Sequence, residues 1–341
     1  MLHRLALVAT CPIMRIVPDP LPDIAWRALT EDDVDALHDL HRRFEAEHRL
    51  PSRTSRENLV HDMAGPKTNL ATDTRVAVAV DGTFVASAWL DLTLGRGVKH
   101  RAFIITNALP GYGELELDAI DWAEAQVRNR FAAIEDDLPR VIRTFTEATL
   151  TDRIARYESR GYAVVRYFID MVRSLADPFP DPVVPRGVEL LPWHERWLRS
   201  AFETDAEAFQ DHYGWLPRTW DDWLHRLARP GCRPDLSHVV VADGEVVAYC
   251  LNGVYPQDWD VGGRKDGWID SLCTRRAWRK KGLASALVNA SFRSFADAGL
   301  DGASIGVDAA SPTGAIHLYE ALGFREEHRM VDMMKEFSPS E

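Results

Sequence analysis

An internal repeat of 162 residues constrains the fold of this chain more than any other feature. Residues 157–162 read YESRGY, and 162 positions later residues 319–324 read YEALGF. The dipeptides Asp81-Gly82 and Asp243-Gly244 recur at the same spacing. A fixed period of this length indicates two copies of one domain. With 341 residues, the chain is long enough for two domains that each bury a core.

Both copies show the same predicted order of elements. An N-terminal helical part is followed by an alternating strand, Arg75–Val80 in the first copy and His238–Ala242 in the second. An Asp-Gly hairpin turn and another strand come next, and further helices and strands complete the copy. We therefore predict an α/β (α+β) fold with a mixed, mostly antiparallel twisted sheet flanked by helices in each copy. The polar segment 49–69 is predicted to be a loop.

Closely spaced prolines mark the boundary between the copies. The segment 176–182 reads ADPFPDP, and such proline spacing favours extended backbone and opposes helix. The predicted division is an N-terminal extension over residues 1–26, a first domain over 27–176, a linker over 177–187 and a second domain over 188–341.

A basic, glycine-containing turn occurs once, in the second copy. Residues 279–284 read RKKGLA, between a predicted strand at 268–274 and a predicted amphipathic helix at 283–298. Free backbone N–H groups and the positive end of the dipole make a helix start favourable for a phosphate or diphosphate. The alternative is a basic loop that only caps the helix.

A second motif follows. After a predicted strand at 303–307, residues 311–314 read SPTG, typical of an N-cap with proline at the first helical position, so a helix is predicted from Ser311 to Leu322. The helix ends in LYEALGF at 318–324, and a last strand is predicted at 328–337. R-x-x-G-x-A followed by L-Y-E-x-L-G-F resembles the GNAT superfamily of N-acetyltransferases, in which tandem members are known.

The resemblance implies specific roles. Backbone groups of the strand would pair with the pantetheine arm of acetyl-CoA, and the turn would bind its diphosphate. Tyr319 would protonate the departing CoA thiolate, although it could also be an ordinary half-buried aromatic residue. Many relatives have asparagine where Ser311 stands, so Ser311 could contact the cofactor or only cap its helix. The residues expected to bind the cofactor are Leu272, Cys273, Thr274, Arg279, Lys280, Lys281, Gly282, Leu283, Ala284, Ser285 and Ser311.

Amine attack on a thioester also needs a base and a donor for the oxyanion. Asp270, on the strand that leads into the turn, is the candidate base, and a hydrogen-bonded structural aspartate is the alternative. A backbone N–H near Cys273 would serve the oxyanion. Shifted back by 162, the turn falls on 117–122, LDAIDW, which contains two carboxylates and no basic residue. The first copy is therefore expected to be catalytically silent, with Tyr157 a core residue.

Acceptor specificity in the family usually comes from the region that corresponds to 201–227. Asp211 could receive a cationic amine, and Tyr213 and Trp215 could form the wall of its pocket. Buried aromatic and solvated acidic residues are the alternative. The net charge of −12 disfavours nucleic-acid binding and favours a cationic acceptor.

Four cysteines without metal-ligand spacing indicate neither zinc nor disulfides and fit a reducing cytoplasm. Residues 1–10 are too short an apolar stretch for a signal peptide or a membrane span. The sequence thus predicts a cytoplasmic acetyltransferase, monomeric or homodimeric, that moves acetyl from acetyl-CoA to a primary amine of a small molecule by direct attack. Another acyl-CoA donor, a protein acceptor and a non-catalytic CoA-binding or regulatory role remain alternatives.

Overall fold

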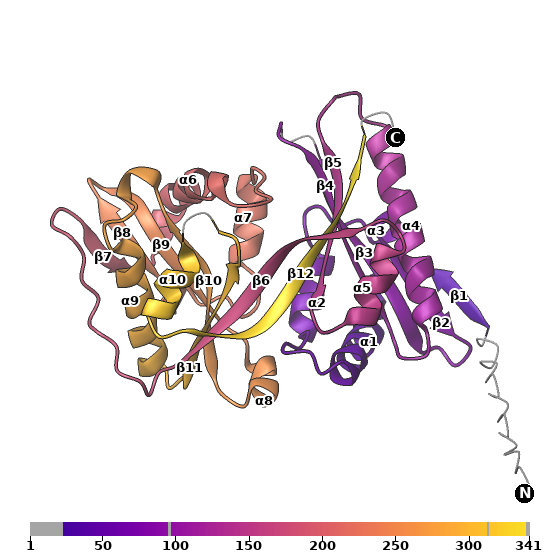
Figure 1. Ribbon diagram of the computed structural model, residues 1–341, viewed down its shortest axis with the longest axis horizontal. Coiled ribbons are helices and arrows are strands. Elements are labelled where there is room, and N and C mark those ends of the chain that lie inside the picture. Colours follow the sequence, from indigo (N-terminus) through magenta and orange to yellow (C-terminus); the bar gives the residue numbers. More distant parts are fainter. Residues whose placement is uncertain (1–22, 95–96, 312–313, 339–341) are drawn as a thin grey trace, which may run out of the picture.

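In the computed structural model, which describes residues 23–94, 97–311 and 314–338, twelve strands form one continuous sheet flanked by helices (Figure 1). The strand order is β1-β2-β3-β4-β5-β12-β6-β11-β10-β9-β8-β7. Two neighbouring pairs, β4–β5 and β10–β11, are parallel, and the other pairs are antiparallel. The mixed, mostly antiparallel sheet predicted from the sequence is confirmed.

The first copy contains β1 (Ile24–Arg27), α1 (Val34–Glu47), α2 (Arg56–Met63), α3 (Leu70–Asp73), β2 (Thr74–Ala79), β3 (Phe84–Thr93), β4 (His100–Ala108), α4 (Gly113–Ala132), β5 (Arg140–Glu147), α5 (Thr151–Glu158) and β6 (Ala163–Ser174). The second copy contains β7 (Glu189–Pro192), α6 (Leu198–Ala208), α7 (Trp220–Leu227), β8 (His238–Ala242), β9 (Glu245–Val254), α8 (Trp259–Gly262), β10 (Asp266–Thr274), α9 (Leu283–Asp297), β11 (Gly302–Asp308), α10 (Ala315–Ala321) and β12 (Arg325–Phe337). Residues 175–188, between β6 and β7, form neither helix nor strand. The domain limits themselves remain a prediction.

The two copies exchange their last strands. β12, the last strand of the second copy, lies between β5 and β6, and β6 lies between β12 and β11. Phe168 of β6 pairs with Met330 of β12, and these two residues occupy equivalent positions in the two copies because they are 162 positions apart. A pseudo-twofold axis that relates the copies therefore passes through this pair. The skipped residues of the two bulges, Val165 and Glu327, are also 162 positions apart. The seam is therefore symmetric about the axis.

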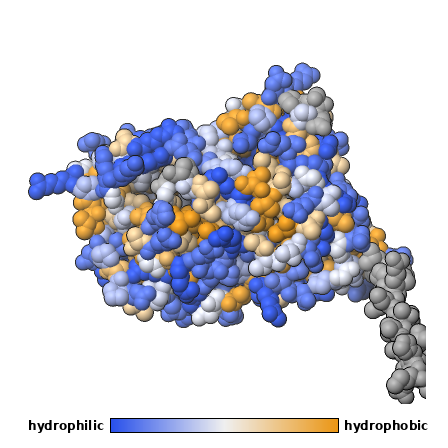
Figure 2. Space-filling view, in the orientation of Figure 1, coloured by the Kyte–Doolittle hydropathy of each residue, from blue (hydrophilic) through white to orange (hydrophobic). Residues whose placement is uncertain are grey.

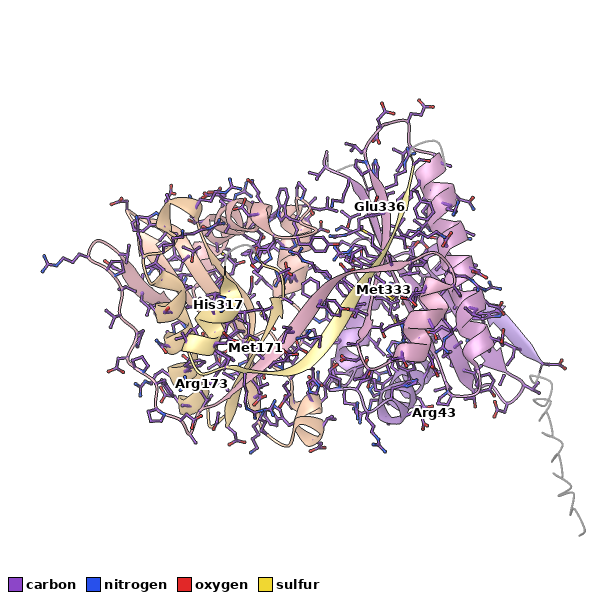
Figure 3. All side chains as sticks on the ribbon, in the orientation of Figure 1. Arg43, Met171, Arg173, His317, Met333 and Glu336 are labelled. Atoms are coloured by element: carbon purple, nitrogen blue, oxygen red, sulfur yellow. The ribbon has the colours of Figure 1, made fainter. Side chains whose placement is uncertain are left out.

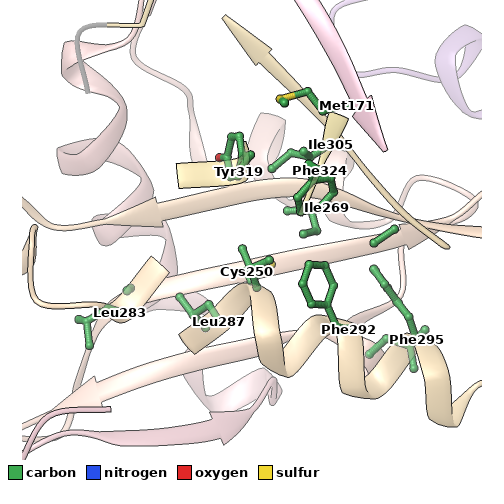
Figure 4. Close-up of a cluster of buried hydrophobic side chains, with 14 of the residues drawn as sticks. Met171, Cys250, Ile269, Leu283, Leu287, Phe292, Phe295, Ile305, Tyr319 and Phe324 are labelled. Atoms are coloured by element: carbon green, nitrogen blue, oxygen red, sulfur yellow. The ribbon is translucent and has the colours of Figure 1, made fainter. Parts of the chain in front are cut away.

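Core packing follows the exchange. Met171 of β6 packs in the second copy's core with Ile269 and Ile305, whereas its counterpart Met333 of β12 packs in the first copy's core (Figures 3 and 4). Arg143 of β5 and Asp332 of β12 form a buried ion pair between the copies, with the carboxylate accepting at 3.0 and 2.5 Å. Each copy needs a strand of the other to complete its core.

Three sequence predictions were wrong in detail. Segment 49–69 contains helix α2, which begins after Ser55, whose hydroxyl accepts the Asn58 N–H at 3.1 Å. Helix α10 begins at Ala315 and not after Ser311, because Gly314 adopts a left-handed conformation with φ 71° at its N-cap. The Pro312-Thr313 part of that motif lies outside the described residues.

The third error concerns the repeat, which is not free of gaps. The first parallel pair is His100–Arg140 in the first copy and Asp266–Gly302 in the second. The offset between equivalent residues is therefore 166 positions for β4 and β10 but 162 positions for β5 and β11. Residues 117–122 consequently lie inside α4 and do not correspond to the basic turn. The segment of the first copy that does correspond is the short connection 109–112 between β4 and α4.

The face of the molecule seen in Figure 2 carries mostly hydrophilic side chains with scattered hydrophobic patches. Within the described ranges, no helix combines the length and the hydrophobicity that crossing a membrane requires.

Candidate active site

Strands β10 and β11 separate after four paired residues, which leaves a gap at one edge of β10. Their parallel pairing covers Asp266–Ile269 and Gly302–Ile305 and then ends, although both strands continue. On its other edge β10 stays bonded to β9 as far as Thr274. Backbone groups of residues 270–274 therefore face the gap without a strand partner, and an extended amide-containing chain could pair with them. The predicted pantetheine positions Leu272, Cys273 and Thr274 lie here.

The Cys273 side chain lies in a hydrophobic core and is not a candidate catalytic group. It is buried against Tyr249 and Trp223, and this burial raises the pKa of its thiol well above the ordinary value. Cys273 could therefore contribute only its main chain to the gap, and the predicted pairing of this strand with a pantetheine arm stays a prediction.

The segment 275–282, here called the cofactor loop, lies between β10 and the N-terminus of α9. Lys280 and Gly282 have positive φ angles of 60° and 81°, and residues 280–282 are exposed. The N-terminus of α9 has no side-chain cap, and the first intrahelical bond of this turn runs from the Ala286 N–H to the Gly282 carbonyl. The N–H groups of Leu283, Ala284 and Ser285 precede that bond, so they can bind an anion.

Asp211 holds this loop. Its carboxylate accepts from Arg276 at 3.0 and 2.7 Å and from Arg279 at 2.7 Å. Arg279 also donates to the backbone carbonyls of Thr274 and Ala208. Hydrogen bonds from the two arginines lower the pKa of Asp211 far below its usual range. Asp211 was predicted as a candidate to bind a cationic amine, but these contacts favour a role in positioning the cofactor loop.

Asp270 sits at a β-bulge where the gap begins. The β9–β10 register skips it between Ile269 and Ser271. Tyr255 donates its hydroxyl hydrogen to the Asp270 carboxylate at 2.8 Å, and the Arg226 guanidinium donates to the Asp270 backbone carbonyl at 3.1 Å. Burial raises the pKa of the Asp270 carboxyl to about 6. A carboxylate with this pKa is suited to accept a proton near neutral pH.

Tyr319 lies on α10 and packs against Phe324 at the margin of the second core (Figure 4). Its side chain is 7% exposed, and none of the described residues forms a hydrogen bond with its hydroxyl. Burial raises the pKa of this hydroxyl, which keeps it protonated. Ser311 follows β11, where its backbone N–H bonds to the Asp308 carbonyl; it does not cap α10.

A cavity of about 690 Å³, here called the interdomain cavity, lies between the copies. The sheet of the first copy contributes Trp89, Ile105 and Phe145, and the second copy contributes Trp215 and the α7 arginine Arg226. Arg226 also donates to the Asp270 backbone carbonyl, so one residue of the lining bonds directly to the bulge. The first copy therefore builds one wall of a cavity whose other wall includes this neighbour of the candidate base.

Tyr213 and Trp215 both line this cavity. The Tyr213 ring already lies 4.9 Å from the Arg143 guanidinium and 4.6 Å from that of Arg166. These contacts join Tyr213 to the seam between the copies and leave less of its ring for an acceptor. Trp215 remains a candidate wall residue.

The corresponding gap in the first copy is filled by its own side chains. β4 and β5 also separate after four parallel pairs. Arg153 of α5 donates to the Thr106 backbone carbonyl at 2.5 Å, and Tyr157 bonds to the Thr106 hydroxyl at 2.8 Å. Glu116, 1% exposed, pairs with Arg153 and Arg156 at 3.4 and 2.6 Å. We call Glu116, Arg153, Arg156 and Tyr157 the plug.

Tyr255, Arg226 and the plug were not predicted from the sequence, apart from the core position of Tyr157. Tyr255 and Arg226 reach Asp270 from β9 and α7, and no local motif announces such contacts. The plug is built from two separate helices, α4 and α5, and its arginines resemble the exposed charges of any amphipathic helix. Among the described residues, no group of three or more His, Cys, Asp or Glu side chains is arranged to hold a metal ion.

Comparison with known proteins agrees with this geometry. Residues 192–324 match the acetyltransferase (GNAT) family. A GCN5-related N-acetyltransferase from Sphaerobacter thermophilus has a similar structure over 94% of this chain and 98% of its own, with a TM-score of 0.71 and 27% identity. A tandem GNAT protein from the clavulanic acid biosynthesis pathway shares the fold over 92% of this chain and 98% of its own, with a TM-score of 0.64 and 16% identity. Residues 192–324, within the second copy, therefore form a GNAT acetyltransferase domain, and the chain as a whole shares the fold of tandem GNAT proteins.

Two mycothiol acetyltransferases are similar in sequence. The protein from Thermobispora bispora is 28% identical over 57% of this chain, and the one from Nocardiopsis dassonvillei is 31% identical over 44% of it. The matched regions cover 65% and 46% of the lengths of these two enzymes.

Proposed function

We propose that the second copy transfers acetyl from acetyl-CoA to a primary amine of a small molecule, and that the first copy binds no cofactor. The observation that carries the proposal is the open gap beside β10, which continues into an uncapped helix start with a basic loop. The gap suits the pantetheine arm, and the helix start suits the diphosphate. Family membership supports an acyl-CoA donor.

The proposed reaction is direct. The amine nitrogen attacks the thioester carbonyl carbon and gives a proton to the Asp270 carboxylate, directly or through water. A backbone N–H of the unpaired part of β10 stabilises the oxyanion. When the C–S bond breaks, Tyr319 donates its hydroxyl proton to the thiolate. Both side chains suit these roles, since the pKa of Asp270 is about 6 and the raised pKa of Tyr319 keeps its proton on until a stronger base forms.

A panel of amines incubated with acetyl-CoA tests the proposal, with CoA release and the mass of each product as readouts. We expect an N-acetylated amine, and we expect Tyr319→Phe to lower kcat by about 10- to 100-fold with little change in the KM for acetyl-CoA. Full turnover by Tyr319→Phe would exclude the acid role. Binding of acetyl-CoA without acetylation of any amine would favour the non-catalytic alternative, and turnover only with a longer or charged acyl-CoA would replace the donor.

A further inference from the structure

The interdomain cavity has an apolar wall on the side of the first copy. Ile105 is 50% exposed and Phe145 is 37% exposed, which is unusual for large apolar side chains on central strands of a sheet. Phe103 stacks on Phe145 with ring centroids 5.4 Å apart, so the wall has a fixed shape. Exposed apolar side chains inside a concave cavity are typical of a small-molecule site.

Positive charge dominates the rest of the lining. Among the described residues, six cationic side chains and three carboxylates line the cavity. The cationic residues are Lys67, Arg101, Arg143, Arg218, Arg226 and Arg229, and the carboxylates are Asp62, Asp91 and Asp222. The whole chain carries a net charge of −12, so this local excess of positive charge opposes the overall balance.

Four of these cations are already neutralised by a carboxylate. Arg143 pairs with Asp332, and Arg218 pairs with Asp205 at 3.0 Å. Lys67 and Arg229 pair with Asp222 and Asp62, at 2.9 and 3.3 Å. Within the described ranges, Arg101 and Arg226 have no carboxylate oxygen within 4 Å of their side-chain nitrogens. Arg226 lies beside Asp270, which leaves Arg101 as the lining cation that forms no ion pair with a described carboxylate.

Arg101 is held rigidly while this charge stays unpaired. Its Nη1 donates to the Gly214 carbonyl at 2.8 Å, and its guanidinium lies 4.6 Å from the centre of the Phe103 ring. Its buried Nε finds no acceptor among the described residues. Arg143 and Arg218 lie nearby and carry the same charge as Arg101, whereas the nearby Asp91 and Asp332 carry the opposite charge. The pKa of Arg101 is lowered to about 10, mainly by burial and to a smaller extent by the positive charge of Arg143.

An unpaired arginine in a partly buried cavity is a binding group for an oxyanion. We propose that the acceptor carries a carboxylate or phosphate that binds Arg101, and an apolar body that packs against Ile105 and Phe145, with its amine at the Arg226 and Asp270 end. This inference rests on the proposed acetyl transfer. It replaces the expectation, drawn from net charge and Asp211, that the acceptor is simply cationic.

Matched amines test this inference. Phenylalanine is compared with phenethylamine for the carboxylate, and glucosamine 6-phosphate with glucosamine for the phosphate. We expect the anionic member of at least one pair to have a kcat/KM about 10- to 100-fold higher. Arg101→Met should abolish that preference by raising the KM of the anionic amine. It should leave the kcat/KM of the matched amine without the anionic group, and the KM for acetyl-CoA, unchanged. The control is Arg233→Met, which removes a half-buried arginine paired with Asp235 outside the cavity.

A binding measurement keeps the test independent of turnover. N-acetylphenylalanine, which has the anion and the aromatic body but no free amine, should bind the wild type and Arg233→Met, and bind Arg101→Met at least about 10-fold more weakly. No preference in either pair, or equal losses for both members in Arg101→Met, would overturn the inference while acetyl transfer stands. If no amine is acetylated, the proposed function fails, and the binding difference alone decides whether Arg101 is an anion site.

Discussion

The two gaps of the sheet have the same strand geometry and opposite contents. β4–β5 and β10–β11 each pair over four residues and then separate. In the first copy Arg153 and Tyr157 bond to the polar groups of Thr106 beside the gap. In the second copy residues 270–274 have no strand partner on the side of the gap, and the Tyr319 hydroxyl forms no hydrogen bond with a described residue. A shared fold thus prepares the site twice, and side chains decide whether it is available for a ligand.

The connections after the two strands differ as well. In the second copy, the eight residues of the cofactor loop lie between Thr274 and α9, and five of them are arginines or lysines. One of the five, Arg275, bonds to Thr204. Four residues without a basic side chain precede α4, whose first turn carries Glu114 and Glu116. Negative charge at that helix start opposes a diphosphate. We therefore expect that the first copy does not bind the cofactor.

Breaking the plug should have the largest effect on stability. We expect Arg153→Ala to lower the free energy of unfolding by about 2–3 kcal/mol, because the buried Glu116 loses one of its two cationic partners and the Thr106 carbonyl loses its donor. Urea unfolding measures this. Arg160→Ala, which removes an exposed pair with Asp121, should cost less than about 1 kcal/mol.

Opening the plug should not create a second site for acetyl-CoA, because the basic loop is still missing. Titration of Arg153→Ala with acetyl-CoA should give the same stoichiometry as the wild type. A second binding event would show that the plug alone keeps the first copy silent.

The two repeat-related tyrosines should respond in opposite ways to loss of the hydroxyl group. Tyr157→Phe removes a buried hydrogen bond and should cost about 1 kcal/mol of stability with turnover unchanged. Tyr319→Phe removes no hydrogen bond made with a described residue, so its free energy of unfolding should change by less than about 0.5 kcal/mol while turnover falls. Equal stability losses in both variants would remove the distinction between a structural and a catalytic tyrosine.

The smallest expected effect is a change in the pH dependence of kcat/KM, and it concerns Asp270 at the bulge of β10, which the equivalent position on β4 lacks. Asp270 corresponds in ladder register to the buried, apolar Ile104, and the β3–β4 pairing has no bulge there. We expect kcat/KM to rise with pH through about 6 as Asp270 loses its proton, and Asp270→Asn to lose this limb. A wild-type profile without that limb would exclude Asp270 as the base.

The same carboxyl group links activity to stability with a defined sign. Its folded pKa of about 6 lies above the ordinary value of 3.8, so the folded state holds the proton more tightly than the unfolded chain. Its stabilising contribution is complete below pH 3.8 and is lost as the pH rises through about 6. Asp270→Asn should therefore be no less stable than the wild type at pH 8, which thermal unfolding can check.

The sequence predicted those features that local chemistry determines. Alternating apolar residues identified β8, and the amphipathic pattern over 283–298 identified α9, which ends at Asp297. The exchange of β6 and β12 was beyond reach, because a strand's side-chain pattern does not say which copy's sheet it joins. Asp270 was found as a candidate base, but its bulge and its bond to Tyr255 depend on β9, and the plug depends on packing between α4, β4 and α5.

The central claim is that acetyl-CoA binds once, at the cofactor loop. Calorimetric titration should show one site per chain in the wild type and no binding to Gly282→Trp. Gly299→Trp is the matched control, because both glycines have positive φ and open space for a side chain, and Gly299 lies at the far end of the same helix. One site, lost in Gly282→Trp and kept in Gly299→Trp, is the predicted result. Two sites, or unchanged binding by Gly282→Trp, would contradict the account.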